Sequence, residues 1–175
     1  IQSFDQIIED GYVYVDKTDL VYKLVKEGKI YFLSRPRRFG KSLLISTLKS
    51  YFQGKKDLFK GLAIDKLETE WAEYPVFHIS FGASNFTKHG TLDELLCKYM
   101  SDFEKEYQID TGLQDYGLRF RNILKEARKK TGRRAVVLVD EYDKPMLDVL
   151  ELDYYVTDSE GNRIKLEDYN RNLLR

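Results

Sequence analysis

The sequence predicts an α/β protein, in which helices cover both sides of a mainly parallel sheet and form a three-layer core. Apolar runs of strand length alternate along the chain with longer segments whose apolar residues recur at helical spacing. Strands joined through helices in this order pair in parallel. The 175 residues contain 42% hydrophobic residues and no internal repeat, which indicates one globular domain with a substantial core.

Three apolar runs are the predicted strands of this sheet. Residues 29–33 are expected to form a buried strand, and residues 76–81 form the next one after Pro75. The run at 135–139, AVVLV, is continuous and rich in β-branched residues, as a strand buried on both faces requires.

Helices are predicted between and after these strands. Gly28 and Gly54 are expected to end the first two of them, and the motif at residues 91–94, TLDE, is a capping box for the third. The tail is expected to form two short β segments around a Gly-Asn turn, followed by the start of another helix. The predicted helices cover residues 19–27, 43–52, 91–103, 116–130 and 166–175, and the hairpin covers 156–164.

Charge and cysteine content exclude several classes of function. The 29 basic and 29 acidic residues balance, so no overall field draws the chain to nucleic acid or to a membrane. Cys97 lies in a periodic apolar segment and is expected to be a core thiol in a reducing compartment, and two separate histidines make no zinc site. Without a membrane span or a signal peptide, we expect a cytoplasmic protein; the sequence does not indicate its oligomeric state.

The stretch SRPRRFGKS at residues 34–42 joins the first predicted strand to the second predicted helix. A helix start offers unpaired N–H groups and partial positive charge, so such a loop can enclose phosphate. Gly40 allows close approach of the backbone, Lys41 neutralises the β- and γ-phosphates, and the Ser42 hydroxyl coordinates Mg²⁺. Arg35 occupies the position where the usual phosphate-binding pattern has its first glycine. The predicted phosphate-binding residues are Arg37, Arg38, Phe39, Gly40, Lys41, Ser42 and Leu43.

Two adjacent acids, Asp140 and Glu141, follow the apolar run at 135–139. Open parallel sheets bind their ligands at the carboxyl ends of the strands. We therefore expect Asp140 to hold the Mg²⁺ shell, with Ser42, and Glu141 to orient and deprotonate an attacking water. Lys41 is the second expected catalytic residue. The expected cofactors are ATP and Mg²⁺.

Three motifs together resemble the AAA-ATPase-like family of P-loop NTPases: residues 14–18 (YVDKT), 35–42 (RPRRFGKS) and 139–145 (VDEYDKP). The resemblance spans about residues 4–150 and implies that Pro-Arg-Arg before the Gly-Lys pair is a recurring variant of the loop. Family members are largely bacterial, and many end in a nuclease-like domain of the PD-(D/E)XK class. The resemblance also implies a sheet of about five strands, so the predicted P-loop core is incomplete at its C-terminus.

The resulting hypothesis is a partial AAA-ATPase-like domain over residues 1–175, with a lead-in segment at 1–28, a nucleotide-binding core at 29–150 and a hairpin excursion with the next helix at 151–175. It would bind ATP and hydrolyse it to drive a conformational change in a larger protein. The alternative is a regulatory nucleotide-binding module with little or no hydrolysis, in a protein that contacts nucleic acid through another domain. A nucleic-acid adaptor acting through the basic cluster at residues 128–134 is a third possibility.

Overall fold

The computed structural model describes residues 3–34, 36 and 39–174, and it divides the chain into two compact units. The first unit contains residues 1–78 and 133–138, and the second contains residues 79–132 and 139–175. Helices and a small parallel sheet are both present, in agreement with the predicted α/β class.

Short helices surround an aromatic core in the first unit. Phe4 and Phe59 are completely buried, with ring centroids 4.7 Å apart, and the Tyr14 ring meets Phe4 edge-on at 5.1 Å. Such tilted and edge-on pairs stabilise beyond the area that they bury. The helical elements are α1 (Phe4–Glu9), α2 (Thr18–Glu27), α3 (Lys41–Phe52) and the 3₁₀ turns η1 (Lys56–Phe59) and η2 (Ala63–Lys66).

The carboxylate of Asp16 connects the start of α2 to η2. Its Oδ1 accepts hydrogen bonds from the backbone N–H and the hydroxyl of Thr18, at 2.9 and 2.7 Å, and its Oδ2 accepts one from the N–H of Ala63 at 2.7 Å. Thr18 is fully buried, and its hydroxyl oxygen accepts from Ile64 N at 3.0 Å. Asp16 therefore has a structural role at the start of α2.

A buried carboxylate, Glu68, joins α2 and α3. It accepts a hydrogen bond from the Tyr51 hydroxyl, and its Oε2 lies 3.2 Å from the ammonium nitrogen of Lys26. Its Oε1 accepts from the backbone N–H groups of Thr69 and Glu70 at 2.9 and 3.0 Å. Burial alone would raise the pKa of Glu68, but the hydrogen bonds from Tyr51, Glu70 and Lys26 outweigh it and hold this pKa below the usual 4.5.

We expect Tyr51→Phe to lower the free energy of unfolding by about 1.5–3 kcal/mol, because it removes a hydrogen bond to a buried charge. The pKa of Glu68 is lower in the folded protein than in the unfolded chain, so its ionised carboxylate stabilises the fold at pH values above 4.5. This stabilisation is lost as the pH falls below 4.5 and through the folded-state pKa. The variant should therefore show a shallower loss of stability in acid than the wild type. Urea unfolding at several pH values would measure both effects, with Tyr22→Phe as the control because its ring under Lys26 is kept. If the free energy of unfolding falls equally steeply in acid for wild type and Tyr51→Phe, this account of Glu68 is contradicted.

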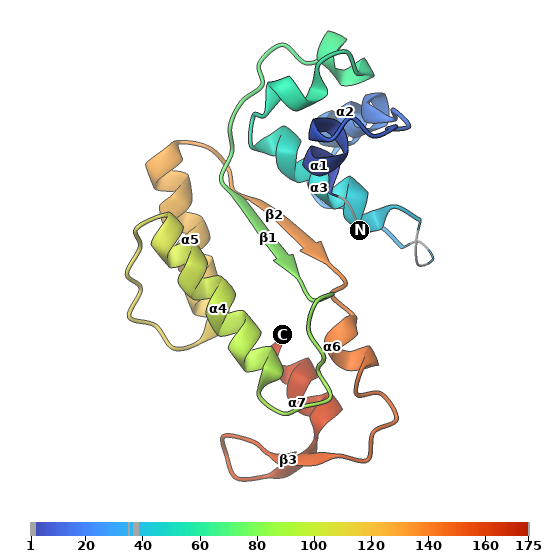
Figure 1. The fold of residues 1–175 in the computed structure, drawn as a ribbon. Helices are drawn as coiled ribbons and strands as arrows, with labels where there is room; N and C mark the ends of the chain where they lie inside the picture. The colour runs from blue at the N-terminus through green and yellow to red at the C-terminus, as the bar shows by residue number, and fades with distance from the viewer. Residues whose placement is uncertain (1–2, 35, 37–38, 175) are drawn as a thin grey trace. The chain divides into compact units, whose positions relative to one another are not determined.

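The parallel sheet consists of β1 (Val76–Ser80) and β2 (Val136–Asp140), whose arrows run in the same direction in Figure 1. In the first unit Val136 N donates to Pro75 O at 2.8 Å, and in the second unit Phe81 N donates to Asp140 O at 3.1 Å. The first bond joins the starts of the two strands and the second joins their ends, as parallel pairing requires. Both strands were predicted from their apolar runs.

The expected strand at residues 29–33 is wrong. This segment has no regular structure, and Ile30 and Phe32 are 94% and 72% exposed. A strand needs a neighbour for its backbone hydrogen bonds. Among the described residues the strands pair only as β1 with β2 and as β3 with β4, so an apolar sequence alone does not make 29–33 a strand.

The prediction that the run at 135–139 is buried on both faces is also wrong. Leu138 and Asp140 are buried, whereas Val137 and Val139 are 40% and 42% exposed. Side chains of a strand alternate between the two faces of its sheet. Within the described part of the chain only one face of β2 is therefore well covered.

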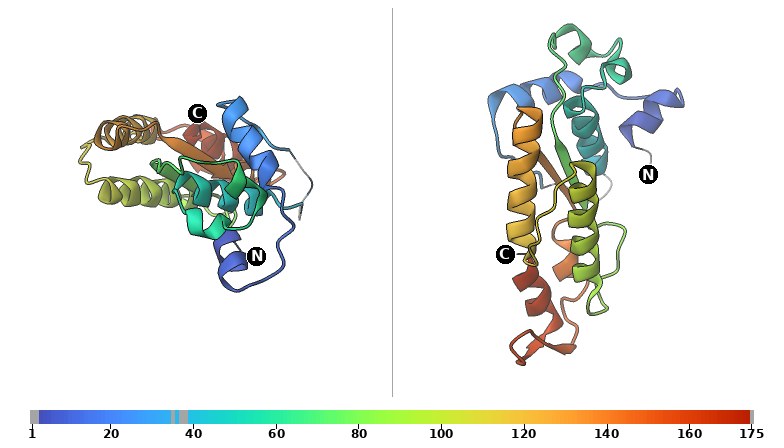
Figure 2. Two further views of the ribbon diagram at one scale, coloured as in Figure 1. Left: turned by 90° about the horizontal axis from the view of Figure 1, so that it is seen from above. Right: turned by 90° about the vertical axis from the view of Figure 1, so that its left-hand side faces the viewer.

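In the second unit, α4 (Thr91–Glu106) and α5 (Tyr116–Thr131) lie side by side in both views of Figure 2. The half-buried Arg119 donates to Glu104 through Nε and Nη2, at 3.0 and 2.7 Å, and joins the two helices. Cys97 is exposed, so the expected core thiol is wrong. Cys97 follows directly on the buried Leu96 and lies about 100° round the helix from it, outside the apolar stripe.

The predicted capping box at the start of α4 is wrong as well. The N-cap is Gly90, which has the left-handed φ of 87°, and Thr91 is already the first helical residue. Glu94 N donates to Gly90 O at 2.9 Å. A glycine reaches this conformation at little cost, and it places Thr91 one residue too late to act as the cap.

The tail forms the expected hairpin and helix. Val156 faces Ile164 across the antiparallel pair, and Val156 packs with Val149 and Leu166 in a small core. The Asp158 carboxylate accepts from the backbone N–H of Asn162 at 2.8 Å and so closes the turn. The elements are α6 (Lys144–Leu147), β3 (Tyr155–Thr157), β4 (Arg163–Lys165) and α7 (Leu166–Leu173).

Candidate functional site

The helix α3 begins directly after a glycine in a left-handed conformation. Gly40 is its N-cap, with φ 75° and ψ 18°, and Lys41 is its first residue. Leu44 N donates to Gly40 O at 2.9 Å, which closes the first helical turn. A residue with a Cβ is strained at this φ, so glycine is the residue that suits this position.

The first turn of α3 carries the predicted phosphate-binding residues. Lys41, Ser42 and Leu43 are half-buried, and Phe39 before the helix is 64% exposed. The first N–H groups of a helix have no partner inside it, and the helix dipole adds partial positive charge there. With a lysine and a hydroxyl in the same turn, this helix start has the donor groups that a phosphate needs.

The first turn is held in place by two hydroxyl side chains that sequence analysis missed. Ser46 and Thr47 donate their hydroxyl hydrogens to Leu43 O, at 2.9 and 2.8 Å. Ser46 Oγ also accepts from Phe4 N at 2.9 Å, which ties the start of α1 to α3. Serine and threonine often bond back to a carbonyl one turn earlier, so their spacing from residue 43 was the available signal.

The three arginines of the loop, Arg35, Arg37 and Arg38, lie outside the described residues. The interpretation of Arg35 as a departure from the glycine pattern, and of Arg37 and Arg38 as phosphate ligands, therefore stays a prediction. Ser34, Pro36, Phe39 and Gly40 are the described residues of this stretch before α3.

The two predicted acids lie at the carboxyl end of β2, in the second unit. Asp140 is buried and is the last residue of the strand, and its carbonyl accepts from Phe81 N. Glu141 is exposed and has φ 54°, which is left-handed although the residue is not glycine. Such a conformation costs on the order of 1 kcal/mol or more, and strained residues of this kind cluster at functional sites.

The carboxylate of Glu141 lies against the backbone of Gly82, which comes two residues after the end of β1. A Cβ atom at position 82 would be 3.0 Å from Glu141 Oε2 and 3.1 Å from both Cδ and Oε1. This contact was missed because residues 82 and 141 are far apart in the sequence. The only available signal was that a glycine follows a predicted strand.

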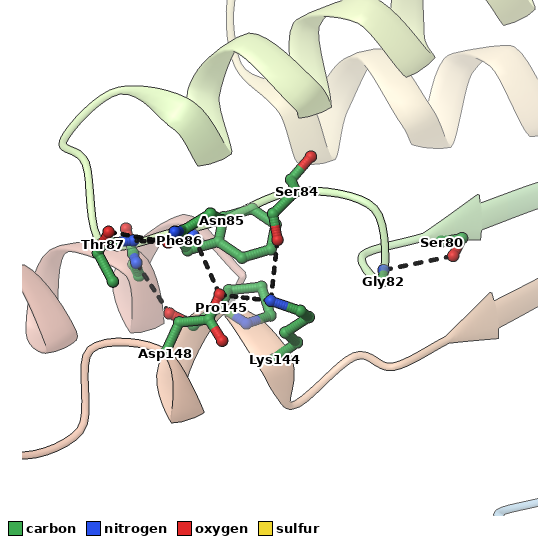
Figure 3. Close-up of polar contacts among 10 residues, drawn as sticks. Ser80, Gly82, Ser84, Asn85, Phe86, Thr87, Lys144, Pro145 and Asp148 are labelled. Carbon is green, nitrogen blue, oxygen red and sulfur yellow. Dashed lines mark hydrogen bonds and ion pairs between the residues drawn. The ribbon is translucent and has the colours of Figure 1, made fainter. Parts of the chain in front are cut away.

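The motif after the acids, residues 142–145 (YDKP), makes several contacts within the second unit. Asp143 is the N-cap of α6, and its carbonyl accepts from Met146 N and Leu147 N at 3.1 and 3.0 Å. Lys144 Nζ donates to Ser84 O at 2.9 Å and to Asp148 Oδ2 at 2.5 Å, as Figure 3 shows. These contacts agree with a structural turn before Pro145.

The predicted site residues thus fall into two groups, one in each unit. Phe39 to Leu43 lie together at the start of α3, and Asp140 and Glu141 lie together at the end of β2. Within the described residues no group of three or more histidine, cysteine, aspartate or glutamate side chains is arranged to hold a metal. The Ser42 hydroxyl and the Asp140 carboxylate are each oxygen ligands of the kind that Mg²⁺ prefers.

The basic cluster at residues 128–134 is largely engaged in contacts within the protein. Lys130 Nζ donates to Gln108 O at 3.0 Å beyond the end of α4, and Lys129 Nζ lies 2.6 Å from Glu126 Oε1. The Arg133 guanidinium carbon lies 5.6 Å from the centroid of the Tyr74 ring. These contacts favour the structural interpretation of the cluster over a surface for nucleic acid.

Comparison with known proteins identifies the family of this chain. A family model described as "Predicted AAA-ATPase" matches residues 1–169. A similar protein from Azotobacter chroococcum mcd 1, named "Uncharacterized protein in vnfD 5'region", is 41% identical over 152 residues, which are 86% of this chain and 29% of that protein. The chain therefore spans less than a third of the length of this relative. No solved structure matches. Among the described residues no helix is long and apolar enough to cross a membrane.

Proposed function

Because the chain belongs to the AAA-ATPase-like family of predicted AAA-ATPases, we propose that it binds ATP with Mg²⁺ and hydrolyses it. The nucleotide cycle would drive a conformational change in a larger protein. The observation that carries the proposal is the start of α3, where left-handed Gly40 leads into Lys41 and Ser42. The relative in Azotobacter supports an origin in bacteria.

Each group at the start of α3 has a task in binding. The N–H groups of the first turn donate to phosphate oxygens, and the Lys41 ammonium neutralises the β- and γ-phosphates. Ser42 offers its hydroxyl oxygen to the metal, and Asp140 holds the water shell of the metal with its carboxylate. When bound, Mg²⁺ neutralises charge that develops on the phosphate oxygens.

Glu141 is the proposed general base. Its carboxylate would orient a water molecule and accept its proton during attack on the γ-phosphate. The left-handed backbone of Glu141 supports this assignment, because strained residues cluster at functional sites, although Trp71, Gln108 and Glu151 have a left-handed φ as well. The alternative is a nucleotide-binding regulatory module with little or no hydrolysis, in which Arg35 replaces the usual first glycine.

Asp140→Asn tests the metal part of the proposal. We expect the variant to bind ATP without Mg²⁺ as tightly as the wild type does. The increase in ATP affinity on adding Mg²⁺ should be smaller in the variant by a factor on the order of 10. The physical reason is that an amide replaces a charged oxygen in the metal's surroundings. Calorimetric titration of ATP with and without Mg²⁺ measures the difference.

Asp153→Asn is the control for this experiment, because Asp153 is an exposed acid of the same unit and has no role in the proposed site. Its Mg²⁺ dependence should equal that of the wild type. An unchanged Mg²⁺ dependence in Asp140→Asn would remove Asp140 from the proposed metal site.

A further inference from the structure

We propose that Gly82 is a positioning residue for Glu141: the missing side chain at position 82 leaves the space in which the Glu141 carboxylate lies. The inference rests on the proposed function, since it assigns to Gly82 the task of placing the general base. Both residues, and the residues that anchor their backbones, belong to the second unit.

The space beside Gly82 is too small for both a side chain and the Glu141 carboxylate. A Cβ atom on Gly82 would lie 3.0–3.1 Å from all three atoms of the Glu141 carboxyl group, closer than ordinary van der Waals contact. Alanine at position 82 would therefore push the carboxylate away. Gly82 has no left-handed φ, so alanine would not strain the backbone of residue 82 itself. Any effect of the change must come from the added methyl group.

The backbone around Gly82 is held from both sides and cannot easily withdraw. On one side Phe81 N donates to Asp140 O at 3.1 Å. On the other side Lys144 Nζ donates to Ser84 O, and Phe86 N donates to Asp148 Oδ2 at 3.1 Å (Figure 3). The Phe86 ring is 1% exposed, which fixes the end of this loop in the core.

The backbone of Glu141 is held as well. Its carbonyl accepts from Lys144 N at 3.0 Å, and the residue before it, Asp140, is paired with β1. Lys144 thus anchors both segments. Its N–H donates to Glu141 O, and its ammonium donates to Ser84 O, two residues after Gly82. With both backbones anchored, an added methyl group at position 82 moves the carboxylate and not the chain.

The test is Gly82→Ala in the intact protein, measured by steady-state ATP hydrolysis. We expect kcat to fall on the order of 10-fold while KM for ATP changes less than about 2-fold, because a general base displaced by a fraction of an ångström loses its alignment but phosphate binding does not involve it. Gly117→Ala is the matched control. It lies in the same unit, has no left-handed φ, and its Cβ would meet only the Asp115 side chain, at 3.3 Å.

A double-mutant cycle with Glu141→Asp separates positioning from general disruption. The shorter aspartate withdraws its carboxylate from position 82, so adding Gly82→Ala to Glu141→Asp should lower kcat less than about 3-fold. A cycle in which Gly82→Ala lowers kcat equally in both backgrounds would overturn the inference. So would a Gly82→Ala enzyme that behaves like Gly117→Ala while Glu141→Asp is impaired, and the proposed function would survive that result. If Glu141→Gln hydrolyses ATP as fast as the wild type, Glu141 is not the base, and the inference fails together with that part of the proposed function.

Discussion

Lys41→Ala is expected to weaken the binding of Mg-ATP by at least about 10-fold. Lys41 is the first residue of α3, directly after the left-handed Gly40. In the proposed site its ammonium neutralises the β- and γ-phosphates, and an interaction between such ionised groups contributes about 1.5–3 kcal/mol. That energy corresponds to roughly 10- to 150-fold in affinity, before any loss from the disturbed loop.

Calorimetric titration of Mg-ATP measures this loss of affinity directly. Lys49→Ala is the matched control, because Lys49 lies in the last turn of the same helix and is also half-buried. Both variants should have the wild-type circular dichroism spectrum. A folded Lys41→Ala variant with unchanged ATP affinity would remove the phosphate-binding assignment from the start of α3.

Glu141→Gln is expected to keep Mg-ATP bound while turnover falls on the order of 10²-fold or more. Glutamine has nearly the size and hydrogen-bonding capacity of glutamate, but its amide cannot accept a proton from water at neutral pH. The change is local, because the backbone of Glu141 is anchored through its carbonyl to Lys144 N. Phosphate release and ATP titration, measured on the same preparation of the intact protein, give the two quantities.

The same measurement decides between the enzyme and the regulatory module. If the intact wild-type protein releases no phosphate above background, the regulatory module is the better account. If wild type and Glu141→Gln hydrolyse ATP at the same rate, the base is another residue, and Asp143 at the start of α6 is the next candidate.

Several elements of the fold could be predicted because their cause is local. The helix after Gly40 follows from a glycine that reaches φ 75° and from apolar residues at helical spacing. The hairpin was visible in its Gly-Asn turn, and the Asp158 carboxylate closes that turn over only four residues. Helix α5 was expected over residues 116–130, and it spans Tyr116–Thr131 with Gly132 as its C-cap at φ 68°.

Most of the failures concern contacts over long distances in the sequence. Residues 29–33 have the apolar pattern of a strand, but strand formation also requires a paired neighbour, which the pattern does not contain. Cys97 was placed in the core because its segment is apolar, whereas its exposure depends on which face of α4 meets α5. The capping box failed because Gly90 already occupied the cap.

The sequence by itself determined the chemistry that the chain offers: a lysine and a serine after Gly40 at a helix start, and Asp140 and Glu141 at the end of a strand. These assignments depend on residue type and on neighbours within a few positions, which the sequence states directly. Only the tertiary structure decided that Glu141 adopts φ 54° and that its carboxylate lies against Gly82. The physical reason is that this arrangement depends on parallel pairing of β1 with β2 and on the Lys144 contact to Ser84 O, which join residues about 60 positions apart.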